Sequence, residues 1–166
     1  ILFGSIFSVM WVKLSKIGKN PSIPLKFCFG IAQLALGFLL TKLGYHFVNE
    51  AYQVPILTLV FLYMLHTTGE LFLSPIGLSM VTKLSPKNMA GTAMGAWFLS
   101  FAIANYAGGK IAAITGGHGG GEALSTEAGL LQYLDVFSTI GYVLLVIAVV
   151  IFLINKPIKK LMHGVE

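Results

Sequence analysis

One acidic side chain stands in the middle of an apolar stretch long enough to cross a bilayer. The stretch runs from residue 54 to residue 81, with Glu70 near its centre and no basic residue inside it. A charge there costs at least ~2.5–3.5 kcal/mol on insertion scales, so such a residue is usually paired, neutralised or used. Glu70 is therefore predicted to serve a substrate or proton pathway. The alternative is a carboxyl group that is kept protonated or hydrogen-bonded and only supports helix packing.

Two further polar residues share a helical face with this acid. His66, Glu70 and Ser74 are spaced four apart, which places them on one side of a helix. Such a polar seam must face protein or water, because lipid would leave its groups unsatisfied. Ser100, on the next apolar stretch, is a further candidate for this seam. A metal site on His66 and Glu70 is not favoured, because two ligands are too few.

The composition is that of a membrane protein. Apolar residues make up 56% of the chain and charged residues only 10%, with a mean hydropathy of +0.84, whereas globular domains are about a quarter charged. The formal charge of +5 comes from lysine alone. These lysines lie between the apolar stretches rather than on one face, so no nucleic-acid partner is expected. The single cysteine, Cys28, is read as a small apolar residue.

At about 20 apolar residues per crossing, the chain divides into four full spans and one fragment. This predicts an all-α, polytopic transmembrane bundle that forms one unit over residues 1–166. The first stretch is read as the tail of a truncated helix, and Ser85 and Pro86 as the N-cap and first residue of the fourth helix. The predicted helices are approximately 1–15, 25–44, 54–82, 86–115 and 132–155.

Lysine positions predict the orientation of the spans. Nine of the eleven lysines fall in the first connection, the third connection and the C-terminal tail, which alternate across the membrane. By the positive-inside rule this side is the cytoplasm, so the C-terminus is cytoplasmic. The expected localisation is an integral membrane protein of the bacterial inner membrane. The acids of the opposite loops are Glu50, Glu122, Glu127 and Asp135.

Three features modify individual stretches. Pro75 removes a hydrogen bond five residues after Glu70, which predicts either a hinge or a static kink. Residues 116–129 are rich in glycine and read as a flexible loop, in which His118 is expected to be solvated rather than a metal ligand. Ala96, Ser100, Ala104 and Gly108 form a small-residue stripe suited to close helix packing. Trp97 beside it faces either lipid or a cavity.

The segment GELFLSPIGLSMVTKLSPKNMAGTAMGAWFLSFAIANYAGG closely resembles the tenth and eleventh helices of the proton-dependent oligopeptide transporter family. The flanking segments extend the resemblance to nearly the whole chain. FSVMWVKL and NPSIPLKFCFGIAQLALGFLL are similar to the end of helix eight, a cytoplasmic loop and helix nine, and YLDVFSTIGY and KPIKKLMHGVE are similar to helix twelve and the tail.

This resemblance implies part of a proton-coupled symporter of di- and tripeptides, in the C-terminal half of a major facilitator fold. It implies that Glu70, the acid of the E-x-x-x-S-P motif, receives the peptide ammonium. Ser74 and Trp97 would line the pocket, and Leu78 and Phe98 would close it on the cytoplasmic side. The partners would be the peptide, protons, the lipid bilayer and the remaining N-terminal helices. No cofactor is expected, and the driving force would be the proton gradient.

The chain also departs from the family pattern. The E-x-x-E-R motif of helix one, the tyrosines of the N-terminal half, the lysine of helix seven and the Asn-Pro of helix eight are absent. Seven further helices are therefore expected before Ile1, and the proton site and the carboxylate clamp would lie there. Gly4 stands where many relatives carry proline, which changes the expected course of helix eight.

Other functions stay open at this level. A transporter of the same fold for nitrate or another anion, a channel subunit and a non-transporting membrane assembly module are the alternatives. A channel would be expected to show a ring of pore-lining polar residues, and an assembly module would not need Glu70. The sequence shows no pairing of a nucleophile with a base and no cluster of metal ligands, so an enzyme is not expected.

Overall fold

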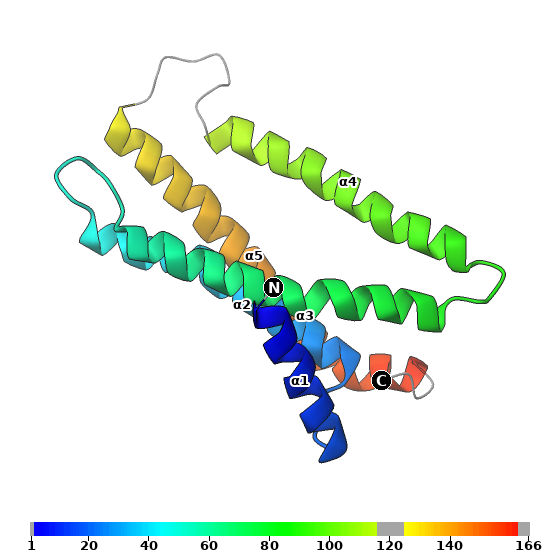
Figure 1. Ribbon diagram of the computed structural model, residues 1–166. Helices are drawn as coiled ribbons and strands as arrows, with labels where there is room; N and C mark the ends of the chain where they lie inside the picture. Colours follow the sequence, from blue (N-terminus) through cyan, green and yellow to red (C-terminus); the bar gives the residue numbers. More distant parts are fainter. Residues whose placement is uncertain (1, 116–124, 163–166) are drawn as a thin grey trace.

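The structure, a computed structural model, describes residues 2–115 and 125–162 of the chain. All regular structure in these two ranges is helical, which confirms the predicted all-α class. Figure 1 shows the elements in chain order: α1 Leu2–Lys16, α2 Ile23–Gly44, the short 3-10 helix η1 Tyr45–Phe47, α3 Ile56–Leu84, α4 Ala90–Thr115 and α5 Thr126–Leu161.

Three ranges are long and apolar enough to cross a membrane: Ile23–Phe47, Ile56–Leu84 and Thr126–Leu161. The sequence predicts four full spans, and α4 is the remaining one. Its 26 residues are sufficient in length, but glycine, serine and Asn105 dilute its hydropathy. A helix with so many small residues is suited to packing against other helices rather than against lipid alone.

Helix α5 is longer than predicted at both ends. It begins at Thr126 rather than near residue 132, because Ser125 caps it by accepting a hydrogen bond from the Ala128 amide at 3.2 Å. Residues 126–129 are therefore helical and not part of the predicted loop, while residues 116–124, including His118, lie outside the described residues. At the other end, the helix passes through Pro157 and ends at Leu161. Helical hydrogen bonding, and not hydropathy, decides both limits.

The connection between α3 and α4 also differs from the prediction. Ser85 ends α3 instead of starting α4, and its hydroxyl group donates to the Val81 carbonyl at 2.5 Å. A residue before proline disfavours the helical region, and Ser85 is extended, with φ −75° and ψ 139°. The Met89 amide then bonds to the Pro86 carbonyl at 2.9 Å, which forms a turn before α4 begins at Ala90.

Helix α2 lies at the centre of the bundle, between α3 and α5. Glycines allow both contacts to be close. A Cβ atom at Gly69 of α3 would lie 2.9 Å from the Gly30 carbonyl oxygen of α2, and one at Gly141 of α5 would lie 2.9 Å from Leu39 Cδ2. Ala35 between these contacts is fully buried. Side-chain packing of this kind replaces the hydrophobic effect as the main attraction between helices in lipid.

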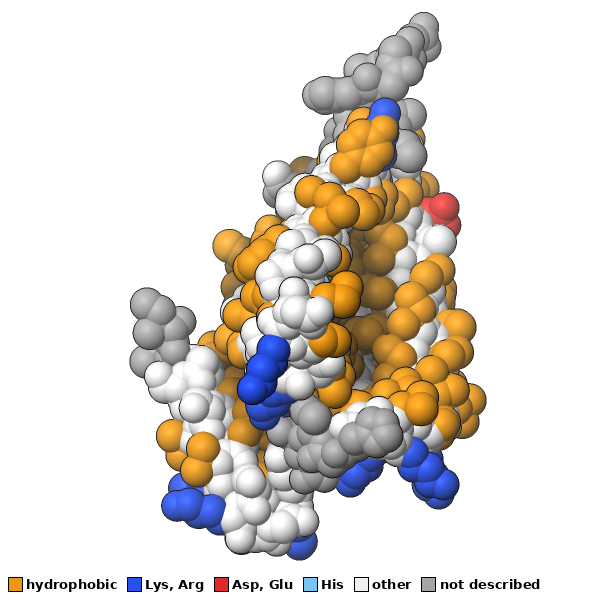
Figure 2. Space-filling model, turned by 90° about the vertical axis from the view of Figure 1, so that its right-hand side faces the viewer, with side chains coloured by type: hydrophobic (Ala, Val, Ile, Leu, Met, Phe, Trp, Pro, Cys, Tyr) orange, Lys and Arg blue, Asp and Glu red, His pale blue; other side chains and the backbone are white. Residues whose placement is uncertain are grey.

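Helix α1 is attached mainly through one aromatic cluster. The rings of Phe7 and Trp11 meet Phe72 of α3 edge to face, at centroid distances of 5.0 and 5.2 Å. Figure 1 shows α1 diverging from the bundle beyond this point. The ends of α1 and α5 carry several lysines, and Figure 2 shows lysines gathered at this end of the molecule below a broad hydrophobic surface.

Candidate functional site

Glu70 lies near the middle of α3 with its side chain exposed. Its neighbour Gly69 is buried against Gly30 of α2, so the acid points away from that contact. Within residues 2–115 and 125–162, no side chain forms an ion pair or a hydrogen bond with the Glu70 carboxylate. These residues therefore give no support to the alternative that Glu70 is a hydrogen-bonded or paired acid that only supports helix packing.

Trp97 is directed at α3. Its indole ring lies so close to Gly77 that a Cβ atom there would be 2.6 Å from Trp97 Cζ2, and the phenyl ring of Phe27 from α2 is 3.2 Å from the same point. The ring also meets Phe101 edge to face at 6.2 Å. Trp97 is half-buried, so of the two predicted environments the structure favours a wall between helices over lipid.

Glu70 and Trp97 are related through the geometry of α3. Gly77, which Trp97 covers, follows Glu70 by two helical turns, so the two positions lie on nearly the same face about 10 Å apart along the axis. Ser74 lies between them on this face and is half-buried. Glu70, Ser74 and Gly77 thus follow one another along one face of α3, and Trp97 of α4 lies over Gly77. We call the three residues Glu70, Ser74 and Trp97 the Glu70 face.

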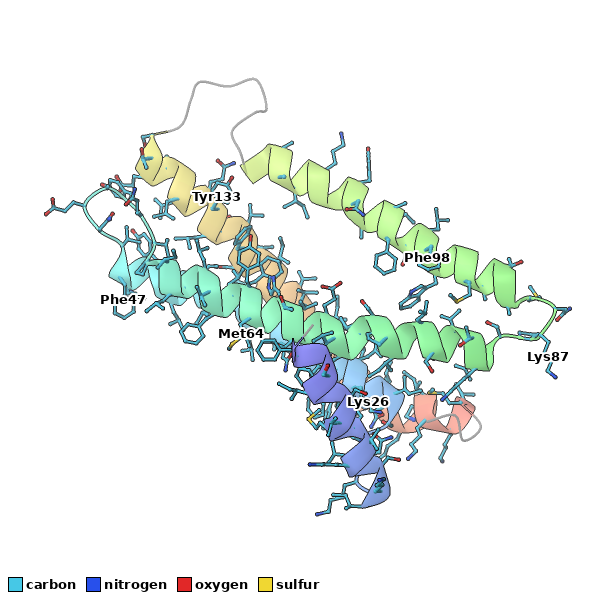
Figure 3. All side chains as sticks on the ribbon, in the orientation of Figure 1. Lys26, Phe47, Met64, Lys87, Phe98 and Tyr133 are labelled. Carbon is cyan, nitrogen blue, oxygen red and sulfur yellow. The ribbon has the colours of Figure 1, made fainter. Side chains whose placement is uncertain are left out.

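The predicted gate residues lie on the two helices beside this face. Leu78 of α3 and Phe98 of α4 are 39% and 58% exposed, so neither is locked into the core. Figure 3 shows Phe98 on the part of α4 that runs opposite α3. Helix α3 is continuous through Pro75, which lies between Glu70 and Leu78 in the chain. The missing amide of Pro75 leaves the Leu71 carbonyl without its usual helical partner.

His66 has a different environment from Glu70. Its ring lies 4.5 Å from the ring of Phe38, and Nε2, when protonated, donates to the Leu34 carbonyl of α2 at 3.3 Å. A Cβ atom at Gly37 would lie 2.6 Å from the imidazole Cδ2, so glycine is needed opposite the ring. His66 therefore packs against α2 instead of sharing the surface of Glu70.

Ser100 is also occupied locally. Its hydroxyl group donates to the Trp97 carbonyl at 2.6 Å, within the same helix. His66 and Ser100 are the two members of the predicted polar seam that lie outside the E-x-x-x-S-P motif. Both thus hydrogen-bond to a backbone carbonyl group. The part of the chain that the structure describes contains no cluster of three metal-ligating side chains.

An apolar cavity of about 470 Å³ adjoins His66 but not Glu70. It lies between α2, α3 and α5, and its lining includes Phe38, Tyr63, Tyr133 and Phe137. None of its lining side chains carries a fixed charge. It therefore lacks the group needed to hold an ionic substrate, and the Glu70 face is the better candidate site.

One basic residue was not expected to be buried. Lys26 belongs to the first connection in the sequence prediction, but it lies in the first turn of α2 and is only 7% exposed. Its ammonium group stands 4.8 Å from the centre of the Trp11 ring of α1. Only the fold could show this contact, although the aromatic residue in the preceding helix is a weak sequence signal for a cation–π partner.

One tyrosine in a connection outside the spans has a raised pKa. Tyr52, which has the unusual φ of 55°, lies between η1 and α3. A hydrogen bond to the Glu127 carboxylate, together with its negative charge, raises the pKa of the Tyr52 hydroxyl group.

The comparisons with known proteins agree with this arrangement. The PTR2 model of the POT family matches residues 1–120. The chain is 37% identical over 150 residues to dipeptide and tripeptide permease A of Edwardsiella piscicida and 34% identical over 167 residues to dipeptide and tripeptide permease B of Aeromonas hydrophila. These matches cover 90% and 99% of this chain, but 30% and 33% of the relatives.

A solved structure shows the same fold. The crystal structure of a peptide transporter POT in complex with sulfate superposes with a TM-score of 0.78 at 32% identity, over 98% of this chain and 31% of that one. The bundle is thus part of a major facilitator fold in an integral membrane protein. The chain spans about a third of the length of the relatives it matches. On these grounds it belongs to the POT family.

Proposed function

We propose that this chain forms the C-terminal-half wall of the peptide site in a proton-coupled symporter of di- and tripeptides. The observation that carries the proposal is Glu70, an exposed acid in the middle of a span without an ionic partner among the described residues. Relatives named dipeptide and tripeptide permease support the substrate class. A peptide ammonium would supply the missing positive charge.

Electrostatics favour this role for the acid. An isolated carboxylate is costly in a low-dielectric site, whereas a hydrogen-bonded ammonium compensates the charge. Hydrogen bonds between charged groups are also about twice as strong as neutral ones. The Glu70 face would therefore select ligands that carry a free amino group, and it disfavours nitrate and other anions.

The remaining residues of the face would shape the pocket. Ser74 would line it beside the acid, and Trp97 would contact the peptide side chains. Leu78 and Phe98 would close the pocket toward the lysine-rich end. Leu78 follows Gly77 in that direction along α3, and Phe98 lies on the facing helix α4. Their exposure leaves them free to change position during alternating access.

Other parts of the proposal concern the membrane and the partners. The lysine-rich ends of α1, α3 and α5 would face the cytoplasm of a bacterial cell, with the C-terminus inside. The proton gradient would drive transport without a cofactor. The N-terminal helices of the same transporter would complete the peptide site and hold the peptide carboxylate.

The test is Glu70→Gln in the complete transporter, which keeps the shape of the side chain but removes its charge. Truncating one member of a buried charge pair costs ~2–5 kcal/mol, so a free-amine dipeptide should bind at least about thirtyfold more weakly. Its N-acetylated analogue should bind nearly as before. Competition curves for both ligands measure the difference. Equal loss for the two ligands, or no loss, would refute the ammonium role.

A further inference from the structure

A second pocket lies between α2 and α5, at the end away from most lysines. Its volume is about 320 Å³, and it is bordered by two leucines and a mainly polar set of side chains. These polar and aromatic side chains are Lys42 and Tyr45 from the end of α2 and η1, and Asp135, Ser138, Thr139 and Tyr142 from α5. The pocket shares no residue with the Glu70 face.

Two opposite charges border this pocket without neutralising each other. Lys42 and Asp135 are both exposed, and the described residues contain no ion pair between them within 4.0 Å. The Lys42 ammonium instead stands 5.9 Å from the centre of the Tyr142 ring. One cation and one anion are thus available to a single ligand that carries both signs.

The length of α5 places the pocket near a membrane interface. Its 36 residues span about 54 Å, whereas the hydrocarbon core is about 30 Å thick. If the excess is shared between the ends, about 12 Å projects on each side. Asp135 lies about 13 Å from the start of α5 and so falls at the border between headgroups and hydrocarbon. The sequence prediction counted it among the acids of the outer side, at the start of the helix predicted over 132–155.

Lys42 reaches the same depth from the other helix. It lies in the last turn of α2, and side chains on a helix lean toward its N-terminus, which here directs the ammonium back along the span to Tyr142. Below this level α5 exposes a strip of apolar side chains that includes Val146 and Val149, which are 63% and 51% exposed. An acyl chain could lie along this strip.

We propose that this pocket binds the headgroup of a zwitterionic phospholipid with a primary ammonium, of the phosphatidylethanolamine type. Lys42 contacts the phosphate and Asp135 accepts hydrogen bonds from the ammonium. Ser138 and Thr139 supply hydroxyl groups for the ester region. A phosphatidylcholine headgroup has no N–H to donate to Asp135, and an anionic headgroup is repelled by it. The inference requires that α2 and α5 span a membrane and that this face of the two helices meets lipid, so it does not depend on peptide transport.

The test is native mass spectrometry of the complete transporter in detergent with phosphatidylethanolamine, phosphatidylcholine and phosphatidylglycerol of identical acyl chains. The wild type should retain phosphatidylethanolamine about tenfold better than the other two, as expected for a hydrogen bond between charged groups. Asp135→Asn should abolish this preference and raise the retention of phosphatidylglycerol. Lys42→Met should lower the retention of all three lipids, because each carries the phosphate.

Lys110→Met is the matched control. Lys110 also stands over a tyrosine, 5.6 Å from the ring centre of Tyr106, but it lies on α4 and outside the pocket. This variant should retain lipids as the wild type does. Equal retention of the three lipids by the wild type, or an equal effect of Lys110→Met and Lys42→Met, would overturn the proposal. If Lys42→Met does not fold, the change of preference in Asp135→Asn decides the outcome alone.

Discussion

The indole ring of Trp97 on α4 packs directly on Gly77 of α3, with Cζ2 2.6 Å from the position that a Cβ atom at Gly77 would take. This contact holds α4 near α3, although α4 stands apart from α3 toward its other end (Figure 1). It also sets the position of an aromatic wall relative to Glu70. The contact leads to the first two predictions.

Gly77→Ala should destabilise the protein, because the added methyl group overlaps the indole ring. Overpacking of this kind costs ~1–3 kcal/mol. Trp97→Ala removes the obstacle, so in that background Gly77→Ala should cost little. Thermal unfolding in detergent of the two single variants and the double variant measures the coupling. Gly95→Ala is the control, because a Cβ atom at Gly95 meets nothing within 4 Å. Additive effects of the two variants would contradict the contact.

Trp97→Ala should also change substrate preference in the complete transporter. The lost aromatic contact scales with the area that it covered, so bulky hydrophobic dipeptides should lose more affinity than dialanine. Competition assays with a series of dipeptides of increasing side-chain size test this. A uniform loss across the series would indicate that Trp97 acts only on stability.

His66→Leu should lower stability without altering recognition of the amino group. The substitution removes the hydrogen bond to the Leu34 carbonyl, which contributes ~0.5–1.5 kcal/mol, and the contact with Phe38. Because His66 packs on α2, the ratio of affinities for a free-amine dipeptide and its N-acetylated analogue should stay that of the wild type. A changed ratio would place His66 in the substrate site.

The Tyr52 hydroxyl group should lose its proton at a higher pH in the folded protein than in the unfolded chain. Its pKa is raised by the hydrogen bond to Glu127, so the bond stabilises the fold below the unfolded pKa of about 10 and is lost as the pH rises through the folded value. Tyr52→Phe should remove a late component of the tyrosinate absorbance titration. Glu127→Gln should shift that component to lower pH, and an unchanged titration in both variants would refute the bond.

The sequence by itself determined the class of the protein and the position of its central acid. Hydropathy predicted the apolar spans, because crossing a bilayer demands about 20 apolar residues whatever their partners. Glu70 stood out for the same local reason, the cost of a charge within such a span. The motif around Glu70, Ser74 and Trp97 lies within two neighbouring helices, so the sequence alone pointed to the family.

Only the tertiary structure decided which of these residues share a surface. Trp97 meets Gly77, His66 turns to α2, and Lys26 is buried over Trp11, because each depends on how separate helices approach one another. Lys42 and Asp135 border one pocket for the same reason, although nothing in the sequence around either residue indicates that the two lie close together. Ser85 ends α3 instead of starting α4 because backbone hydrogen bonds, which a residue pattern does not specify, set the limits of a helix.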